Sequence, residues 1–191
     1  MKMRRCPQPM VCCVQGAAAG GGFALALASD IRIVASNARM NCAFIKLGVG
    51  GCDIGSSYFL PRLVGIQQAL EWCYTGRVFP AQEAKDGGLV RSIHEPDDLL
   101  PAAKALAREM ADNAAPVSMA ITRQLIYRMA GAAHPMDAHR ADSRGIQARG
   151  KMADAREGVV SFLEKRPAKY PDKVSTDLPD IWDHWTPPTF R

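Results

Sequence analysis

The sequence predicts an α/β protein with two differently built halves. Up to about Val90, short strand-like runs alternate with short helix-like runs. After Pro96, hydrophobic residues recur every three or four positions, as in amphipathic helices. Three consecutive glycines, Gly20 to Gly22, stand at the first junction between a strand-like and a helix-like run. The 191 residues, 48% hydrophobic and 23% charged, suffice for one sizeable core and are too few for two large domains.

The first half is expected to begin with a buried strand, a glycine bend and a buried helix. The apolar run Val11 to Val14 predicts the strand, and Phe23 to Ala28 predicts the opening of the helix. Glycine at positions 20 to 22 permits a sharp bend between them. Asp30 to Val34 alternates polar and apolar side chains, which predicts a half-buried strand.

Helices that end at glycines follow. Ser56 to Val64 and Ile66 to Tyr74 are predicted helices, with Gly65 and Gly76 as their stops. The remaining elements predicted for the first half are a short helix at Ala81 to Asp86 and a strand at Leu89 to Ile93.

The second half is predicted to be helical, with an aromatic tail. Two amphipathic helices are indicated by Leu99, Ala103, Leu106 and Met110, and by Val117, Ile121, Leu125 and Met129. Met136 to Met152 is a more polar helical stretch that Gly145 and Gly150 interrupt. The tail after Arg166 carries Tyr170, Trp182, Trp185, Pro187, Pro188 and Phe190, and we expect it to wrap its own or a neighbouring subunit.

Several common assignments for a glycine-rich start are excluded. No Gly-Lys-Ser/Thr follows the glycines, and Ser29-Asp30 closes the helix too early for a dinucleotide fingerprint. Basic residues before the apolar stretch Met10 to Ala28 imitate a secretory signal, but Gln15 and the glycines interrupt that stretch. For the same reason it is not expected to span a membrane.

The glycine bend is the first candidate site. Backbone N–H groups at a helix N-terminus attract negative charge, either a phosphate or the oxyanion that develops on a polarised carbonyl. Glycine also allows a ligand to approach the backbone closely. A tight turn in a core is the alternative explanation of these three residues.

Further motifs follow the glycines in a fixed order. They are Gly20-Gly-Gly-Phe-Ala-Leu-Ala-Leu-Ala-Ser-Asp, Lys46-Leu-Gly-Val-Gly-Gly, Leu60-Pro-Arg-Leu-Val-Gly, Thr75-Gly-Arg-Val-Phe-Pro-Ala-Gln-Glu-Ala and Phe162-Leu-Glu-Lys-Arg. In this order and spacing the chain resembles the crotonase superfamily, the enoyl-CoA hydratase and isomerase group. The resemblance implies the later turns of a ββα spiral over residues 1–95, a helical trimerisation region over 96–166, and a Pro/aromatic-rich tail over 167–191.

The resemblance also implies an oxyanion site at the bend. Family members polarise a thioester carbonyl with two backbone amides, and Gly21 matches one of them, flanked by Gly20 and Gly22 at the substrate. The second amide comes from an Ala-Phe-x-x-Gly-x-Asp segment well upstream of the glycines. We therefore expect it to come from a longer form of this protein or from another chain.

The acid/base positions depart from the hydratase pattern. The two glutamates that hydratases use correspond to Ala24 and Phe44, neither of which transfers a proton, although both are expected to line the substrate. Asp53 matches a position that resembles the acidic residue of dienoyl-CoA isomerases, so isomerisation is favoured over two-glutamate hydration. Capping of the following helix is an equally good explanation of Asp53.

Charge and composition add expectations about ligands. The net charge of +5 and pI near 9.0 suit a CoA ester, and the resemblance puts Lys169 and Lys173 near a neighbouring subunit's adenine. No cofactor is implied beyond coenzyme A as part of the substrate. No metal site is predicted, since the six cysteines and four histidines show no ligand spacing. The cysteines are expected to be reduced core thiols, which favours a cytosolic, mitochondrial or peroxisomal setting.

Three functions follow from the sequence. The first is an acyl-CoA enzyme that forms homotrimers or hexamers, with Gly21 as oxyanion donor and Asp53 as base. The second is an inactive homologue that binds acyl-CoA or assembles with active subunits. The third, and least favoured, is an RNA-binding relative, because the basic residues are not interleaved with aromatic ones in the body of the fold.

Overall fold

The computed structural model describes residues 1–182 and divides into two compact units. The first unit contains residues 1–4 and 10–109, and the second contains residues 5–9 and the chain from Met110 on. The predictions for Trp185, Pro187, Pro188 and Phe190, together with His184, lie outside the described residues.

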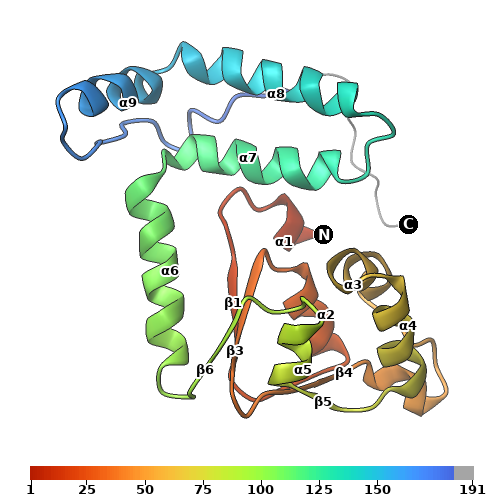
Figure 1. Cartoon of the computed structure of the whole chain (residues 1–191). Coiled ribbons are helices and arrows are strands. Elements are labelled where there is room, and N and C mark those ends of the chain that lie inside the picture. The colour runs from red at the N-terminus through yellow and green to blue at the C-terminus, as the bar shows by residue number, and fades with distance from the viewer. Residues whose placement is uncertain (183–191) are drawn as a thin grey trace. The chain divides into compact units, whose positions relative to one another are not determined.

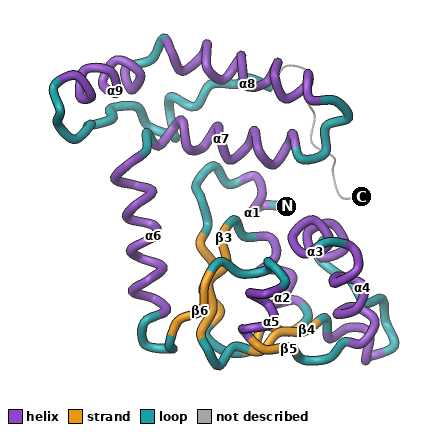
Figure 2. The backbone as a smooth tube through the Cα atoms, in the orientation of Figure 1, coloured by secondary structure: helices purple, strands orange, loops and turns teal. Residues whose placement is uncertain are grey.

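Two small sheets form the centre of the first unit (Figures 1 and 2). The first has the order β1-β3-β6 and is parallel, with β1 at Val11–Val14, β3 at Ile31–Ala35 and β6 at Ser92–His94. The second has the order β2-β4-β5, with β2 at Ala17–Ala19, β4 at Arg39–Asn41 and β5 at Phe79–Pro80. The strands β2, β4 and β5 were not predicted, because each has only two or three residues and depends on a distant partner.

Short helices pack around these sheets. Up to residue 113 they are α1 (Lys2–Arg5), α2 (Gly21–Ala28), the 3₁₀ helix η1 (Ala43–Leu47), α3 (Ser56–Val64), α4 (Ile66–Thr75), α5 (Ala81–Asp86) and α6 (Leu99–Asn113). Trp72 of α4 stacks on Phe79 with the ring centroids 4.0 Å apart, and Phe23 of α2 meets Phe79 edge to face at 5.8 Å. These three buried rings join α2, α4 and β5 into one hydrophobic core.

The prediction of a half-buried strand at Asp30 to Val34 is wrong in one respect, because β3 is buried on both faces. It lies between β1 and β6, with Ile33 packed against Leu99 of α6 and Val34 in the core on the other side. Arg32 is buried because its guanidinium finds carbonyl partners: Nε donates to Leu89 O at 2.9 Å and Nη1 to Ser29 O at 2.8 Å. The strand predicted at Leu89 to Ile93 begins three residues later, at Ser92.

Three helices form most of the second unit. They are α7 (Pro116–Met129), α8 (Pro135–Gly150) and α9 (Ala153–Leu163), and α7 and α8 pack side by side (Figure 1). Gly145 does not interrupt α8 as predicted; it lies inside the helix, where a Cβ atom would already be 3.6 Å from Ile121. This is an ordinary van der Waals distance, so α7 and α8 are in direct contact at Gly145.

The tail wraps the second unit's own helices as far as it is described. Ile181 is 4% exposed and packs with Val117 and Ile121 of α7. An ion-pair network holds the preceding segment: Arg149 Nη2 lies 2.7 Å from Asp154 Oδ2 and 2.8 Å from Asp172 Oδ2. The predicted wrapping of the tail is therefore confirmed up to Trp182.

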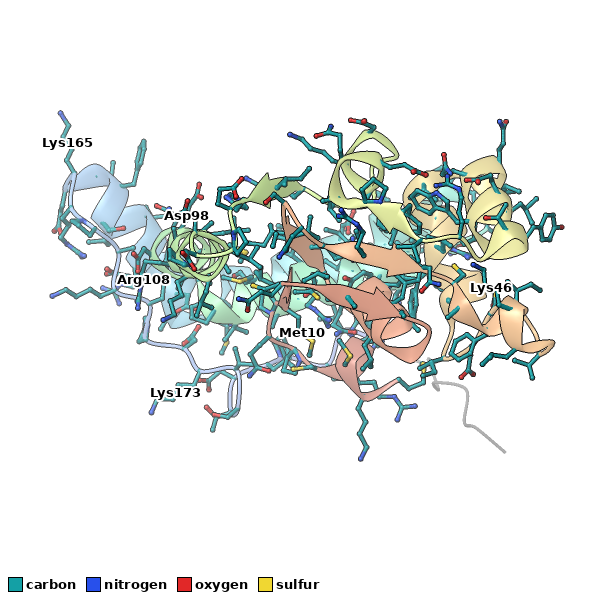
Figure 3. All side chains as sticks on the ribbon, turned by 90° about the horizontal axis from the view of Figure 1, so that it is seen from below. Met10, Lys46, Asp98, Arg108, Lys165 and Lys173 are labelled. Atoms are coloured by element: carbon teal, nitrogen blue, oxygen red, sulfur yellow. The ribbon has the colours of Figure 1, made fainter. Side chains whose placement is uncertain are left out.

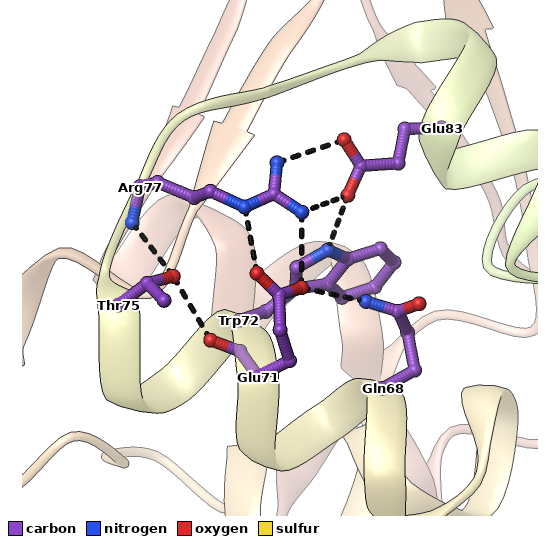
Figure 4. A network of polar contacts seen from close by, with 6 residues as sticks. All are labelled: Gln68, Glu71, Trp72, Thr75, Arg77 and Glu83. Atoms are coloured by element: carbon purple, nitrogen blue, oxygen red, sulfur yellow. Dashed lines mark hydrogen bonds and ion pairs between the residues drawn. The ribbon is translucent and has the colours of Figure 1, made fainter.

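A polar network closes the end of α4 in the first unit (Figure 4). Arg77 bonds Glu71 through Nε at 2.7 Å and bonds Glu83 through both terminal nitrogens. The Glu83 carboxylate also accepts from Trp72 Nε1 at 2.7 Å, so the network anchors a fully buried ring of the core. Hydrogen bonds from Arg77 lower the pKa of both Glu71 and Glu83.

This network predicts a specific loss of stability in acid. A carboxylate with a lowered folded-state pKa stabilises the fold above its unfolded value, 4.5, and this contribution disappears as the pH falls through the folded value. Glu83→Gln should therefore lower the free energy of unfolding near neutral pH by only ~1 kcal/mol, since solvent screens a side chain that is 30% exposed. Its stability should also decline less than that of wild type as the pH falls from about 5.5 to below 4.5. Urea unfolding across this range measures both effects, and parallel curves for the two proteins would contradict the assignment.

Candidate functional site

The glycine bend forms the start of α2. Gly20 has φ of +51°, a backbone conformation that favours glycine, and its N–H donates to Asn41 O of β4 at 3.2 Å. Its carbonyl accepts from Ala24 N at 2.9 Å, which closes the first helical turn. The helix begins at Gly21, two residues earlier than predicted, so glycine contributes to the helix as well as to the bend.

The first N–H groups of α2 are available to a ligand. Gly21, Gly22 and Phe23 precede the first intrahelical donor, Ala24, and within the described residues none of their N–H groups has a hydrogen-bond acceptor. Gly21 is half-buried and Gly22 is exposed. A half-buried, unpaired N–H at a helix N-terminus is the arrangement that stabilises an oxyanion.

Two apolar side chains cover the bend. A Cβ atom placed on Gly20 would lie 3.2 Å from Cζ of Phe44, and one on Gly21 would lie 3.6 Å from Cδ1 of Ile54. Phe44 belongs to η1 and Ile54 to the loop before α3. Phe44 is half-buried and Ile54 is 54% exposed, so the bend has apolar side chains on one side and remains open to solvent.

Asp53 lies in the loop that carries Ile54. Its backbone is fixed by Ser56, whose Oγ accepts from Asp53 N at 3.0 Å while Ser56 N donates to Asp53 O at 3.0 Å. The Asp53 side chain is exposed, and the described part of the chain offers its carboxylate no hydrogen bond or ion pair. The N-cap of α3 is Gly55, without a side-chain hydrogen bond, so Asp53 does not cap this helix.

Ile54 is the residue of this site that sequence reasoning missed. Its φ of +52° is rare for a β-branched residue and costs about 1–3 kcal/mol. Ile54 lies between Asp53, whose backbone Ser56 holds, and Gly55, which also has a positive φ of +85°. The chain therefore makes a tight turn at these residues. No sequence signal distinguishes this isoleucine from an ordinary core residue, because its contact with Gly21 spans 33 positions.

The other predicted site residues are distributed over both units. Ala24 is buried in α2, one turn after the bend. Lys169 and Lys173 belong to the second unit, where both are exposed, and Figure 3 shows the Lys173 side chain projecting outward. A cavity of about 330 Å³ is lined by Lys169, Arg156 and Glu157 among others. All its lining residues belong to the second unit, whereas the glycine bend belongs to the first.

The acidic group of that cavity is already engaged. Glu157 lies 2.6 Å from Arg166 and accepts from the backbone N of Lys169 at 2.7 Å. These partners lower the pKa of Glu157 to about 2, so it is ionised at neutral pH. Arg166 is held by both Glu157 and Glu164.

Metal and membrane features are absent from the described residues. Between Met1 and Trp182, no three histidine, cysteine or acidic side chains gather in an arrangement that could bind a metal ion. In the same part of the chain, no helix combines the length and apolarity that crossing a bilayer requires.

Comparisons with known proteins agree with the motifs. Residues 1–173 match the family described as enoyl-CoA hydratase/isomerase. An enoyl-CoA hydratase of Alternaria alternata, AFT3-1, is 35% identical over 175 residues, which are 91% of this chain and 58% of that protein. The 1,2-epoxyphenylacetyl-CoA isomerase of Escherichia coli is 32% identical over 173 residues, which are 90% of this chain and 64% of that protein.

A solved structure shares the fold. A probable enoyl-CoA hydratase/isomerase from Mycobacterium abscessus superimposes with a TM-score of 0.84 at 31% sequence identity, covering 89% of this chain and 68% of that one. The chain spans about three fifths of the length of the curated relatives that it matches.

Proposed function

Because the chain belongs to the enoyl-CoA hydratase/isomerase family, we propose that it takes part in proton transfer on an acyl-CoA thioester. Membership confirms the resemblance to the crotonase superfamily, and the α/β crotonase-like fold is likewise confirmed.

The single observation that carries the proposal is the unpaired N–H of Gly21. A thioester oxygen within hydrogen-bond distance of this group would gain most when it becomes an enolate oxygen, because negative charge then develops beside the positive end of α2. Phe44 and Ile54 place apolar side chains beside that position.

Asp53 is the proposed base. Removal of an α-proton leaves an enolate, and returning the proton at the γ-carbon moves the double bond, so one carboxylate that takes and returns a proton suffices for isomerisation. Hydration by two carboxylates would need a second acidic group, and Ala24 and Phe44 occupy the two positions of that mechanism. The name of the isomerase among the relatives is compatible with this choice.

A substrate panel tests the proposal. The chain, and the longest reading frame that contains it, are incubated with 2-enoyl-, 3-enoyl- and dienoyl-CoA, and products are separated by chromatography. We expect double-bond migration to exceed addition of water for every substrate that reacts. A dominant 3-hydroxyacyl product would contradict the isomerase assignment.

The inactive homologue is the second candidate, and the same two positions favour it. A protein with Ala24 and Phe44 in place of two glutamates would still offer the Gly21 N–H to a thioester. It would bind acyl-CoA, measured by calorimetry, and give no product from any member of the panel. Binding with turnover would exclude it.

Assembly into a trimer or hexamer is proposed from the surface of the second unit. On α9, Val159, Phe162 and Leu163 lie at helical spacing i, i+3 and i+4, and Phe162 is 81% exposed. We call these three residues the α9 patch. Apolar side chains gathered in this way are typical of a surface that another chain covers.

Phe162→Glu should therefore weaken assembly. A carboxylate placed in a buried apolar interface would lose its hydration without gaining a partner. We expect light scattering to shift from an oligomer toward the 20.7 kDa monomer for this variant. Gln147→Glu, which adds the same charge at an exposed position of α8, is the control and should keep the wild-type mass. Equal masses for all three proteins would exclude the α9 patch as the interface.

A further inference from the structure

Three cysteines lie in a row beside the candidate site in the first unit. Cys73 Sγ of α4 is 3.5 Å from Cys42 Sγ, which follows β4, and 3.8 Å from Cys52 Sγ, which precedes Asp53. All three are free thiols. Their sequence separations of 31 and 21 residues show that the fold, not the local sequence, brings them together.

The backbone holds these thiols in place. A Cβ atom on Gly51 would lie 3.5 Å from Cys73 O, so the loop before Cys52 packs directly on the last turn of α4. A Cβ on Gly76 would lie 3.4 Å from Cys42 O, so the end of α4 is equally close to Cys42. At Gly76, which has a positive φ of +52°, a Cβ atom would also lie only 2.5 Å from Ile45 Cγ2, so glycine is needed there for this close approach.

The three thiols differ in exposure. Cys52 is exposed, whereas Cys42 and Cys73 are buried. A reagent from solution therefore reaches Cys52 first, and Cys73 is the thiol within reach of both neighbours. The prediction that the cysteines are core thiols is accordingly wrong for Cys52, and also for the exposed Cys13 of β1.

We infer that Cys52, Cys73 and Cys42 form a thiol–disulfide relay that carries oxidation by a small disulfide from the surface to the buried pair. The inference goes beyond the proposed function and does not depend on it. Its ligand class is a small-molecule disulfide, and its product is a disulfide bond between Cys42 and Cys73.

The first two steps transfer oxidation to the chain. The Cys52 thiol loses its proton to solvent, and the thiolate attacks one sulfur of the small disulfide, whose S–S bond breaks to release one thiol. Cys73 then attacks Cys52 Sγ, the mixed disulfide breaks, and the second small thiol leaves. Two protein thiols are oxidised and one small disulfide is reduced to two thiols.

The third step moves the bond inward without net oxidation. Cys42 attacks Cys73 Sγ across the 3.5 Å contact, the bond between Cys52 and Cys73 breaks, and Cys52 leaves as a thiolate that regains a proton. The S–H of Cys73 donates to Cys42, which lowers the pKa of Cys42 and raises that of Cys73. The lowered pKa favours the thiolate form of Cys42, which is the attacking group of this third step, while in the second step the proton of Cys73 leaves with the departing small thiol.

Peptide mapping tests the relay in the wild-type chain. The reduced protein is incubated with glutathione disulfide, remaining thiols are alkylated at intervals, and a tryptic digest is analysed without reduction. Cleavage at lysine and arginine puts Cys42, Cys52 and Cys73 on separate peptides, 40–46, 47–62 and 63–77. The linked pair 47–62/63–77 should appear first and then give way to 40–46/63–77. Absence of both linked pairs, or formation of the second without the first, would overturn the relay.

Three variants give independent readouts. Cys42→Ser should accumulate the link between Cys52 and Cys73, and Cys73→Ser should retain glutathione on peptide 47–62. Cys52→Ser should slow formation of the internal disulfide by about tenfold or more, since the buried thiols lose their exposed entry point. Cys13→Ser is the matched control, an exposed thiol outside the cluster, and should leave the order of linked peptides unchanged. Wild-type oxidation rates in Cys52→Ser would contradict entry through Cys52.

Discussion

Replacing Gly21 with proline is expected to reduce acyl-CoA turnover by about a hundred- to a thousandfold, the usual effect of removing one oxyanion donor. Proline lacks the N–H that the proposed mechanism needs. It is also well suited to the first position of a helix, where no intrahelical acceptor is lost, and Gly21 is that position in α2. The change therefore removes the donor and keeps the helix.

The matched control is Gly21→Ala, which retains the N–H. A Cβ at this position would lie 3.6 Å from Ile54 Cδ1, an ordinary van der Waals distance, so alanine fits. Steady-state kinetics should show a lowered kcat for proline and near wild-type kcat for alanine, with similar thermal unfolding midpoints for both. Equal rates in the two variants would mean that the Gly21 amide does not stabilise the transition state.

Parts of the fold could be predicted where the signal is local. Gly65 and Gly76 adopt positive φ angles, +80° and +52°, and the helices before them end at Val64 and Thr75. Both stops could be identified because a residue without a Cβ atom is needed at such positions. The strand Val11–Val14 was predicted with its observed bounds, since four apolar residues before a glycine-containing loop have few alternatives.

Other parts depend on contacts between distant residues and have no local signal. The strand β4 pairs with both β2 and β5. Its residue Met40 pairs with Ala18, 22 positions earlier, and with Phe79, 39 positions later. Arg32 looks like the solvent-facing member of an alternating strand, yet it is buried because carbonyls of α2 and Leu89 surround it. Burial of an arginine is decided by partners that only the folded chain supplies.

The candidate site also contains some residues that the sequence could predict and others that it could not. Gly20 and Gly21 could be identified because consecutive glycines before a helix have a direct backbone consequence. The covering by Ile54, and the choice between base and helix cap for Asp53, required the backbone of the loop. Gly55 takes the N-cap position, which frees the Asp53 carboxylate for another role.

Asp53→Asn is expected to lower the rate of double-bond migration by about a hundred- to ten-thousandfold, the range for loss of a general base. Asparagine has the same shape and cannot take up the α-proton. The fold should be unaffected, because Ser56 bonds only to the backbone of Asp53 and the side chain has no partner among the described residues. Circular dichroism and thermal unfolding measure this second expectation.

Solvent deuterium separates a base from a residue that merely binds substrate. If Asp53 removes the α-proton, wild-type protein should exchange the α-hydrogen of a bound acyl-CoA with D₂O, and Asp53→Asn should lose exchange and migration together. Asp97→Asn, at an exposed position before α6, is the control and should retain both. Continued exchange in Asp53→Asn would mean that a group outside this loop removes the proton. Of the two proposed catalytic groups, only the Gly21 N–H would then remain. The Gly21 variant removes an oxyanion donor, and the Asp53 variant removes a base. Only the Asp53 variant should therefore abolish hydrogen exchange without weakening acyl-CoA binding.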